Sequence, residues 1–433
     1  MPRYGKFGLA SFFVAVCAAS VLPTASTAAA GIAQPRVVSQ DPVNYTPNLV
    51  GDATVAHPAV YAFEPSATLP QMYVGGQFHS LQNAQRTSTY VRPYIAAFNR
   101  TTGAVSTSFH PVLDGSVWAI VSVGSSVYAA GEFTHVNGVA RRGLVKLNAS
   151  GSVDPAFNAS STFSKGVAYD LKSVKGRLIV GGSFPKGLAA LSPTSGADTG
   201  YLNLGISGSV ATLTKEPTHV YRFAVNPGAS RLVAIGNFTT VSGQARARAF
   251  MLNLGASKGV LASWYYAPLS RYCNHKNVPA YLRDVDFSPT GSYFVLVASG
   301  NVPTKGRIGT DVCDAAARLE TNIAHQSKPT WINYTGGDTL HSVAVSSKAV
   351  YVQGHNRWLD NPTGHGSCLT TCVVRHGIGA IDPVTGRALE WNPVKGRGVG
   401  GKETLLTPQG LWVGSDTSLI HREYHYGIAL MPL

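Results

Sequence analysis

The chain has 433 residues, and its 44% hydrophobic and 13% charged residues exclude an intrinsically disordered protein. Its 46 Gly and 25 Pro favour many short strands and turns, and no segment has a long helical period. The formal charge of +14 would attract anionic polymers such as acidic glycans, but no nucleic-acid-binding motif accompanies it, so we expect no nucleic-acid partner.

The N-terminus has the pattern of an export signal. A positive charge at Arg3 and an apolar stretch over residues 7–22 precede an Ala-x-Ala cleavage site at Ala28–Gly31. The apolar stretch is short for a membrane span of roughly 20 residues. We therefore predict a signal peptide at residues 1–30 and a secreted single domain at residues 31–433, with no transmembrane segment after cleavage.

An apolar run that ends in Gly-x-Phe, or in a weaker copy of it, recurs along the rest of the chain. Another apolar run precedes each copy and two follow it, so the unit has four short strands, A, B, C and D, in about 55 residues. The glycine after strand B is expected to permit a bulge or turn that other residues do not allow. The aligned glycines are Gly76, Gly131, Gly182, Gly236, Gly300, Gly354 and Gly414.

Four antiparallel strands at this period describe a propeller blade, and blades must stack around an axis because one blade cannot bury both of its faces. The last copy ends at Leu433 after strand C, whereas the segment Val37–Asn48 lies ahead of the first strand A and resembles a strand D. We therefore predict an all-β, seven-bladed β-propeller of four-stranded antiparallel blades, closed by an N-terminal outer strand in the last blade.

The B–C loops are long and polar, whereas the A–B and C–D connections are mostly tight turns. The face that carries the B–C loops is therefore the expected binding surface. All four cysteines that follow the signal fall on this face, and an even count in an exported protein favours two disulfides. Neighbouring loops of blades four and five would bring Cys273 and Cys313 together, which leaves Cys368–Cys372 as a small local loop. A zinc site that combines the second pair with His365 and His376 is the alternative.

An arginine recurs at an equivalent place ahead of the end of strand C. It either ties down the B–C loop through backbone carbonyls or acidic groups, or it contributes to a basic ring that binds an anionic ligand. The four residues are Arg92, Arg141, Arg246 and Arg375.

Bulky and polar residues stand at equivalent positions early in strand A, where the mouth of the central channel is expected. They either plug the channel or line a pocket for a sugar or another small polar ligand, through ring stacking and hydrogen bonds. The seven residues are Tyr61, Trp118, Tyr169, Phe223, Arg283, His341 and Glu403.

The chain has no nucleophile elbow, metalloprotease motif or P-loop, and its 21 acidic residues are few for a paired-carboxylate hydrolase. The segment His421–Gly427 holds two His and two Tyr, which would suit copper, but exposed loop residues are the simpler interpretation. We therefore expect no catalytic residues, no resident metal and no cofactor.

The segments "YVGGQF" with "RPYIAAFNRTTGAVSTSFHP" and "YAAGEFTHVNGVARRGLVKLNASGSVDPAFNA" resemble the delta-60 type β-propeller repeat of secreted actinobacterial proteins. The resemblance covers roughly residues 70–433. Blades three to five depart from the pattern, and Gly300 lacks the phenylalanine that normally follows. The resemblance implies a secreted propeller, and it implies no established catalytic residues that could be assigned to this chain.

These patterns favour a secreted, monomeric binding protein that recognises a cell-surface glycan or protein through its B–C loop face. The alternative is an extracellular carbohydrate-active enzyme, either a lyase or a metal-dependent oxidase, with its site at the channel mouth. A structural surface protein is a third hypothesis.

Overall fold

The structure, a computed structural model, describes Met1, residues 32–369 and residues 371–433. The described residues form strands, turns and loops, with a single 3-10 helix, η1 (Ala267–Ser270). Apart from Met1, the predicted signal peptide lies outside the described residues.

Seven antiparallel sheets repeat the predicted order of strands A, B and C within the described chain. Strands A are β2 (Ala59–Pro65), β7 (Val117–Val123), β12 (Ala168–Val174), β15 (His219–Val225), β21 (Tyr281–Phe287), β25 (Leu340–Val345) and β30 (Glu403–Thr407). Strands B are β3 (Gln71–Gln77), β8 (Ser126–Gly131), β13 (Arg177–Gly182), β16 (Arg231–Asn237), β22 (Tyr293–Ser299), β26 (Val350–Gly354) and β31 (Gly410–Gly414). Strands C are β6 (Ile95–Asn99), β11 (Leu144–Leu147), β14 (Leu188–Leu191), β19 (Ala249–Leu254), β23 (Ala315–Glu320), β29 (Ile378–Ile381) and β34 (Ile428–Pro432).

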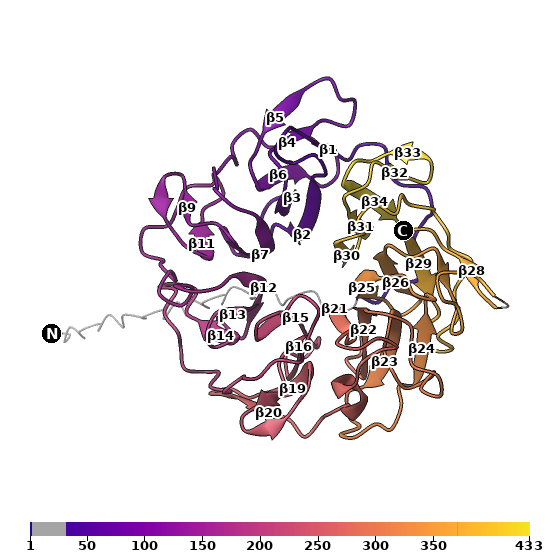
Figure 1. The fold of residues 1–433 in the computed structure, drawn as a ribbon. Coiled ribbons are helices and arrows are strands. Elements are labelled where there is room, and N and C mark those ends of the chain that lie inside the picture. The colour runs from indigo at the N-terminus through magenta and orange to yellow at the C-terminus, as the bar shows by residue number, and fades with distance from the viewer. Residues whose placement is uncertain (2–31, 370) are drawn as a thin grey trace.

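The sheets are arranged around a common centre, with strands A nearest to it (Figure 1). Each strand A contacts the strand A of the next sheet, and β30 contacts β2. The hydrophobic core lies between adjacent sheets, since each sheet buries its faces against its neighbours. Trp412 of the last sheet illustrates this: it is fully buried, with its ring centroid 5.8 Å from that of Phe63 in the first sheet.

The recurring glycine of strand B lies opposite a β-bulge near the start of strand A. In the second sheet the register shifts between Val117 and Ala119, and five other sheets have the same shift. The shift brings a backbone oxygen so close that a Cβ on Gly131 would collide with the Ser116 carbonyl. Glycine has no Cβ, which explains its repetition in the sequence. The same collision would occur at Gly76, Gly182, Gly236 and Gly354.

Strand D is shorter than the sequence pattern predicts. Only two sheets have an assigned fourth strand, β20 (Gly259–Leu261) and β24 (Trp331–Tyr334), and the other five have three strands. In four of those five, strand C keeps only isolated bridges to the fourth segment, as between Phe98 and Val105. In the first sheet a serine turn follows this bridge, because Ser106 Oγ accepts the N–H of Phe109 at 3.1 Å.

The N-terminal segment approaches the free edge of the last sheet. Ser39 N donates to Pro432 O at 2.6 Å and Val43 N to Leu430 O at 3.0 Å, although no strand is assigned between residues 37 and 47. The chain then forms β1 (Asn48–Val50), which pairs with a B–C loop strand of the first sheet. The segment therefore contacts both the last and the first sheet.

Five B–C loops form short hairpins that the sequence analysis did not predict. Linkers ahead of strand A pair with several of these hairpins, as in the Leu113–Val136 bridge, so the loops are held against the sheets. The hairpins are β4 (Ser80–Gln82) with β5 (Thr89–Val91), β9 (His135–Val136) with β10 (Val139–Ala140), β17 (Thr240–Val241) with β18 (Gln244–Ala245), β27 (Trp358–Leu359) with β28 (Val373–Val374), and β32 (Leu419–Ile420) with β33 (Glu423–Tyr424).

The two predicted cysteine pairs lie at disulfide distance, with Cα atoms 5.9 Å apart for Cys273–Cys313 and 5.7 Å apart for Cys368–Cys372. The two cysteines of each pair are 40 and 4 residues apart in the sequence, respectively. Because the longer loop restricts the unfolded chain more, we expect Cys273→Ala with Cys313→Ala to cost about 2 kcal/mol more than Cys368→Ala with Cys372→Ala. Urea denaturation of the two double variants measures this, and equal losses would contradict it.

Candidate functional site

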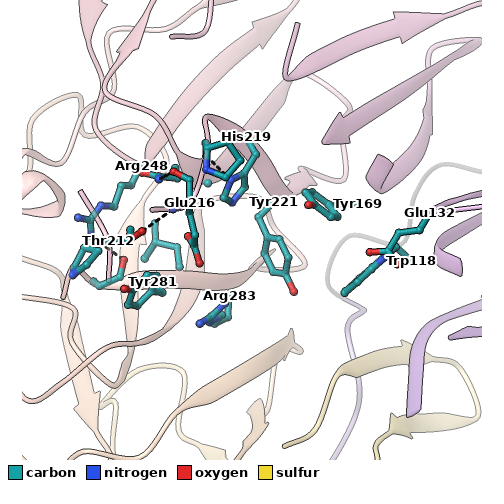
Figure 2. A pocket seen from close by; sticks show the side chains of 16 residues that line it. Trp118, Glu132, Tyr169, Thr212, Glu216, His219, Tyr221, Arg248, Tyr281 and Arg283 are labelled. Atoms are coloured by element: carbon teal, nitrogen blue, oxygen red, sulfur yellow. Dashed lines mark hydrogen bonds between the residues drawn. The ribbon is translucent and has the colours of Figure 1, made fainter. Parts of the chain in front are cut away.

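A cavity of about 320 Å³ lies where strands B end and strands A begin, and residues of the second, third, fourth and fifth sheets line it. Its aromatic lining comprises Trp118, Tyr169, His219, Tyr221 and Tyr281. Its charged lining comprises Glu132, Glu216, Arg248 and Arg283. Figure 2 shows Trp118 and Glu132 on one side of the cavity, Arg248 and Tyr281 on the other, and Tyr221 between them.

The bulge of strand A places the aromatic side chains. Tyr61, Trp118, Tyr169 and Tyr221 each stand at the extra residue of a bulge. The rings of Tyr61 and Trp118 stack with centroids 4.5 Å apart, and Tyr169 lies 5.7 Å from both Trp118 and Tyr221. Burial raises the pKa of Tyr61 to about 12 and also raises that of Tyr169, so both phenols stay neutral. The result is a continuous aromatic wall.

The structure brings three of the seven predicted mouth residues into this cavity: Trp118, Tyr169 and Arg283. Tyr61 packs behind Trp118, and its hydroxyl donates to Gln77 Oε1 at 3.0 Å. His341 also stands at a bulge but lies outside the cavity, because the loop at Gly400 packs against its ring.

Phe223 does not face the channel mouth. It is 1% exposed and belongs to the hydrophobic core between the third and fourth sheets. Tyr221, two residues earlier, takes the bulge position instead. The sequence held a signal for this, since "HVYRF" of the fourth unit aligns directly with "AVYAF" of the first. The physical reason is the bulge itself, which reverses the side-chain alternation along the strand.

The linker ahead of β15 forms one edge of the cavity. Asn237 at the end of β16 holds this linker, because its Nδ2 donates to Glu216 O at 2.9 Å and its Oδ1 accepts from Val210 N at 2.9 Å. Thr212 Oγ1 accepts the N–H of Glu216 at 2.8 Å. Burial lowers the pKa of His219, which keeps its ring neutral at pH 7. Sequence reasoning missed this edge, since the linker carries no repeat pattern.

A second cavity of about 100 Å³ lies among strands A of five sheets, and it contains the predicted residue Glu403. Glu403 Oε2 lies 3.6 Å from Arg222 Nη2, and Lys172 Nζ lies 3.3 Å from Asp170 Oδ1. Glu403 is therefore part of an internal charge network and not of the aromatic cavity. Neighbouring carboxylates raise the pKa of Lys172 and Arg222 although burial opposes their charge.

Four acids in and around this network join adjacent sheets. Each of the four accepts a hydrogen bond from a backbone N–H of the next strand A, at 2.7 to 2.9 Å. The pairs are Glu64 with Ser122, Asp170 with Phe223, Asp284 with Val343, and Asp286 with Val345. Burial raises the pKa of Glu64 and Asp286 to about 8. This geometry gives the acids a structural role.

The four recurring arginines bind backbone carbonyls. In each case Nη1 donates to the preceding residue and another guanidinium nitrogen donates to the D segment of the same sheet. The D-segment acceptors are Ser106 O for Arg92, Pro155 O for Arg141, Ala262 O for Arg246 and Leu389 O for Arg375. These contacts favour the loop-tying interpretation of the arginines over a ligand-binding ring.

No three His, Cys, Asp or Glu side chains are grouped to hold a metal ion within residues 32–369 and 371–433. In the segment proposed for copper, His425 Nδ1 lies 3.1 Å from Thr46 Oγ1, and the Tyr424 ring lies 4.5 Å from the Arg86 guanidinium. Among the helices of the described chain, none has the length and hydropathy that spanning a membrane requires.

A family model described as "Domain of unknown function (DUF5122) beta-propeller" matches residues 126–157, which run from β8 past the end of β11. The protein has an all-β, propeller-like fold. Among solved structures, the β-propeller domain of Cps50 (Swd1) from Myceliophteria thermophila is similar at 9% identity with a TM-score of 0.40, over 68% of this chain and 79% of that chain. No curated protein matches this propeller-like chain.

Proposed function

We propose that this protein is a secreted, non-enzymatic binding propeller whose aromatic cavity recognises a sugar unit of an extracellular glycan. The observation that carries the proposal is the wall formed by Trp118, Tyr169 and Tyr221 beside charged side chains. Flat aromatic faces pack against the C–H groups of sugar rings, while polar groups bind the hydroxyls. The cavity volume is at the lower end of the roughly 300–1,000 Å³ range of small-molecule sites, which suits one or two sugar units.

A buried donor in the wall also supports a polar ligand. Trp118 Nε1 is buried and has no hydrogen-bond acceptor among the described residues. A buried N–H without a partner is unfavourable, and a ligand hydroxyl that entered the cavity would satisfy it.

We further infer that the seven sheets are the blades of one closed ring. The hydrogen bonds from Ser39 and Val43 to β34 support closure through the N-terminal segment, and so does the packing of Trp412 against the first sheet. Paired cysteines are consistent with an oxidising compartment, which supports export through the predicted signal peptide. We propose a monomer of the delta-60 repeat type.

The test is a glycan array followed by calorimetric titration of the best-bound glycan. We expect Trp118→Ala to weaken binding at least about tenfold, because it removes both the stacking face and the free Nε1 donor. Trp358→Ala is the matched control, since Trp358 lies in the β27 hairpin, away from the cavity. Unchanged affinity in Trp118→Ala, or an array without any bound glycan, would contradict the proposal.

A lyase is the second candidate, and His219 is the observation that favours it. The neutral His219 ring lies beside the Tyr221 ring in the wall of the cavity, with the ring centroids 6.3 Å apart, so a base and a proton donor are both present. Incubation with the bound glycan distinguishes the two functions. A new unsaturated product that His219→Ala abolishes would establish the enzyme, whereas an unchanged glycan supports binding alone.

A further inference from the structure

Arg248 lines the aromatic cavity with hydrogen-bonding capacity that the protein leaves unused. It is 2% exposed, and its Nη1 donates to Ala280 O at 2.9 Å. Its Nε and Nη2 have no acceptor among the described residues. These two nitrogens form one edge of the guanidinium, whose parallel N–H bonds match the two oxygens of a carboxylate. A buried charged group in this state lacks the partner that would offset its desolvation.

Arg248 has a left-handed backbone conformation that glycine would adopt at a lower cost, which indicates that its side chain has a functional role. Six sheets place a left-handed residue immediately before strand C, and its carbonyl accepts an N–H at or just after the end of strand B. Four of these six residues are glycine, which adopts this conformation without steric cost. Arg248, with φ of 64°, adopts it at a cost of about 1–2 kcal/mol. The six are Tyr94, Gly143, Gly187, Arg248, Gly377 and Gly427.

Arg283 brings a second cation to the same cavity. It stands at the bulge of β21, where its Nε donates to Ser299 Oγ at 2.8 Å. Its guanidinium carbon lies 5.3 Å from the Tyr281 ring centroid. In the part of the chain that the structure describes, neither Nη of Arg283 has a hydrogen-bond acceptor, so both remain available to a ligand.

The two acids of the cavity are not partners of these arginines. No ion pair joins Glu132 or Glu216 to Arg248 or Arg283 in the described residues. Glu132 lies beside Trp118, across the cavity from Arg248, whereas Glu216 lies on the linker near Arg248 (Figure 2). Glu132 can therefore accept hydrogen bonds from sugar hydroxyls. The negative charge of Glu216 would repel an anionic ligand group that binds at Arg248.

We propose that the cavity selects a hexuronate, a sugar unit whose carboxylate binds between Arg248 and Arg283 while its ring packs on Trp118 and Tyr169. This inference rests on the proposed glycan-binding function and adds its substrate class. A sulfate ester can also accept two parallel N–H bonds from an arginine, so the experiment includes a hexoside sulfate to separate the two anionic groups.

The experiment compares ligands that differ at a single group. Calorimetric titration of the full secreted chain uses methyl glucuronoside and methyl galacturonoside, their neutral hexoside counterparts, the methyl esters of the two uronides, and a hexoside sulfate. We expect at least one uronide to bind about 10–100-fold more tightly than its neutral counterpart and its ester. Tighter binding of the sulfate would overturn the carboxylate assignment. A peptide with a free C-terminus that binds more tightly than any uronide would overturn the sugar class.

Three variants test the charged side chains of the cavity. Arg248→Gly removes the guanidinium and places at this position the residue that four equivalent sheets hold, so the variant is expected to fold. It should lower uronide affinity most of the way toward that of the neutral hexoside, since only the Arg283 contact remains, without a comparable change for the neutral hexoside. Arg142→Gly is the charge-matched control, because Arg142 is exposed and lies outside the cavity. Glu216→Gln should strengthen uronide binding, since it removes the nearby like charge.

The outcomes separate this inference from the proposed function. Equal binding of uronides and neutral hexosides would overturn the inference and leave glycan binding intact. Binding of no sugar by a correctly folded protein would overturn both. Unchanged uronide affinity in Arg248→Gly would overturn the role of Arg248, and circular dichroism of the variant verifies its fold.

Discussion

Gly131→Ala is expected to lower the free energy of unfolding by about 3 kcal/mol. The added Cβ would overlap the Ser116 carbonyl, which the β-bulge presses against the glycine. Neither atom belongs to a flexible side chain, so β7 and β8 must move apart and lose hydrogen bonds or packing. Urea denaturation followed by tryptophan fluorescence measures the loss, and circular dichroism shows whether the remaining sheets stay folded.

Gly228→Ala is the matched control. A Cβ at Gly228 would meet only Ser230 Oγ, at 3.9 Å, and Gly228 has no left-handed backbone. Alanine there restricts the unfolded chain, so we expect stability within about 0.5 kcal/mol of the native chain. A loss at Gly131 no larger than that at Gly228 would show that the close carbonyl is not the reason for the repeated glycine.

The pH dependence of stability should change in Glu64→Gln. Burial raises the pKa of Glu64 to about 8, above its unfolded value, so its neutral form favours the folded state. That contribution is complete below pH of about 4.5 and is lost as the pH rises through 8. Glutamine keeps an oxygen that accepts the Ser122 N–H but does not titrate. The variant should therefore match the native chain at pH 5 and exceed it by on the order of 2–4 kcal/mol at pH 9.

The difference between the two proteins is the relevant measurement, because other groups titrate over the same range. The lowered pKa values of His341 and Lys395 give the native chain an opposing dependence, which cancels in the comparison. Thermal unfolding at five pH values between 5 and 9 gives the profile. A difference that stays constant across this range would mean that Glu64 is already ionised in the folded protein. Glu132→Gln, on an exposed side chain, should leave the profile unchanged.

Much of the repeat was predictable because its determinants are local. Apolar runs of strand length, separated by turn residues, predicted strands A, B and C in all seven sheets. Fourth strands were overestimated, since an apolar run does not reveal that its pairing with strand C is limited to an isolated bridge. The Cys273–Cys313 pair was predictable from the expected adjacency of two loops, and Cys368–Cys372 was the remaining pair within one loop.

The residues at the channel mouth were predictable only where the sequence repeats could be aligned correctly at the start of strand A. Trp118, Tyr169 and Arg283 were found by their place early in strand A, and Tyr221 was missed because the bulge shifts the face of the strand by one residue. Arg248 carried a weak signal, since the equivalent position in four other units holds glycine. Glu216 carried none, because its linker belongs to no repeat.

Local sequence therefore accounts for the strand pattern, the recurring glycine and the Cys368–Cys372 pair, since each depends on residues close in the chain. The Cys273–Cys313 pair, 40 residues apart, followed from the expected order of the sheets. The folded arrangement alone sets the cavity, because Trp118, Arg248 and Arg283 come from three different sheets. It also decides which charges are left without a partner: Glu403 pairs with Arg222, whereas one edge of Arg248 stays free. Such pairing depends on distances between sheets, and side-chain spacing along one strand does not encode them.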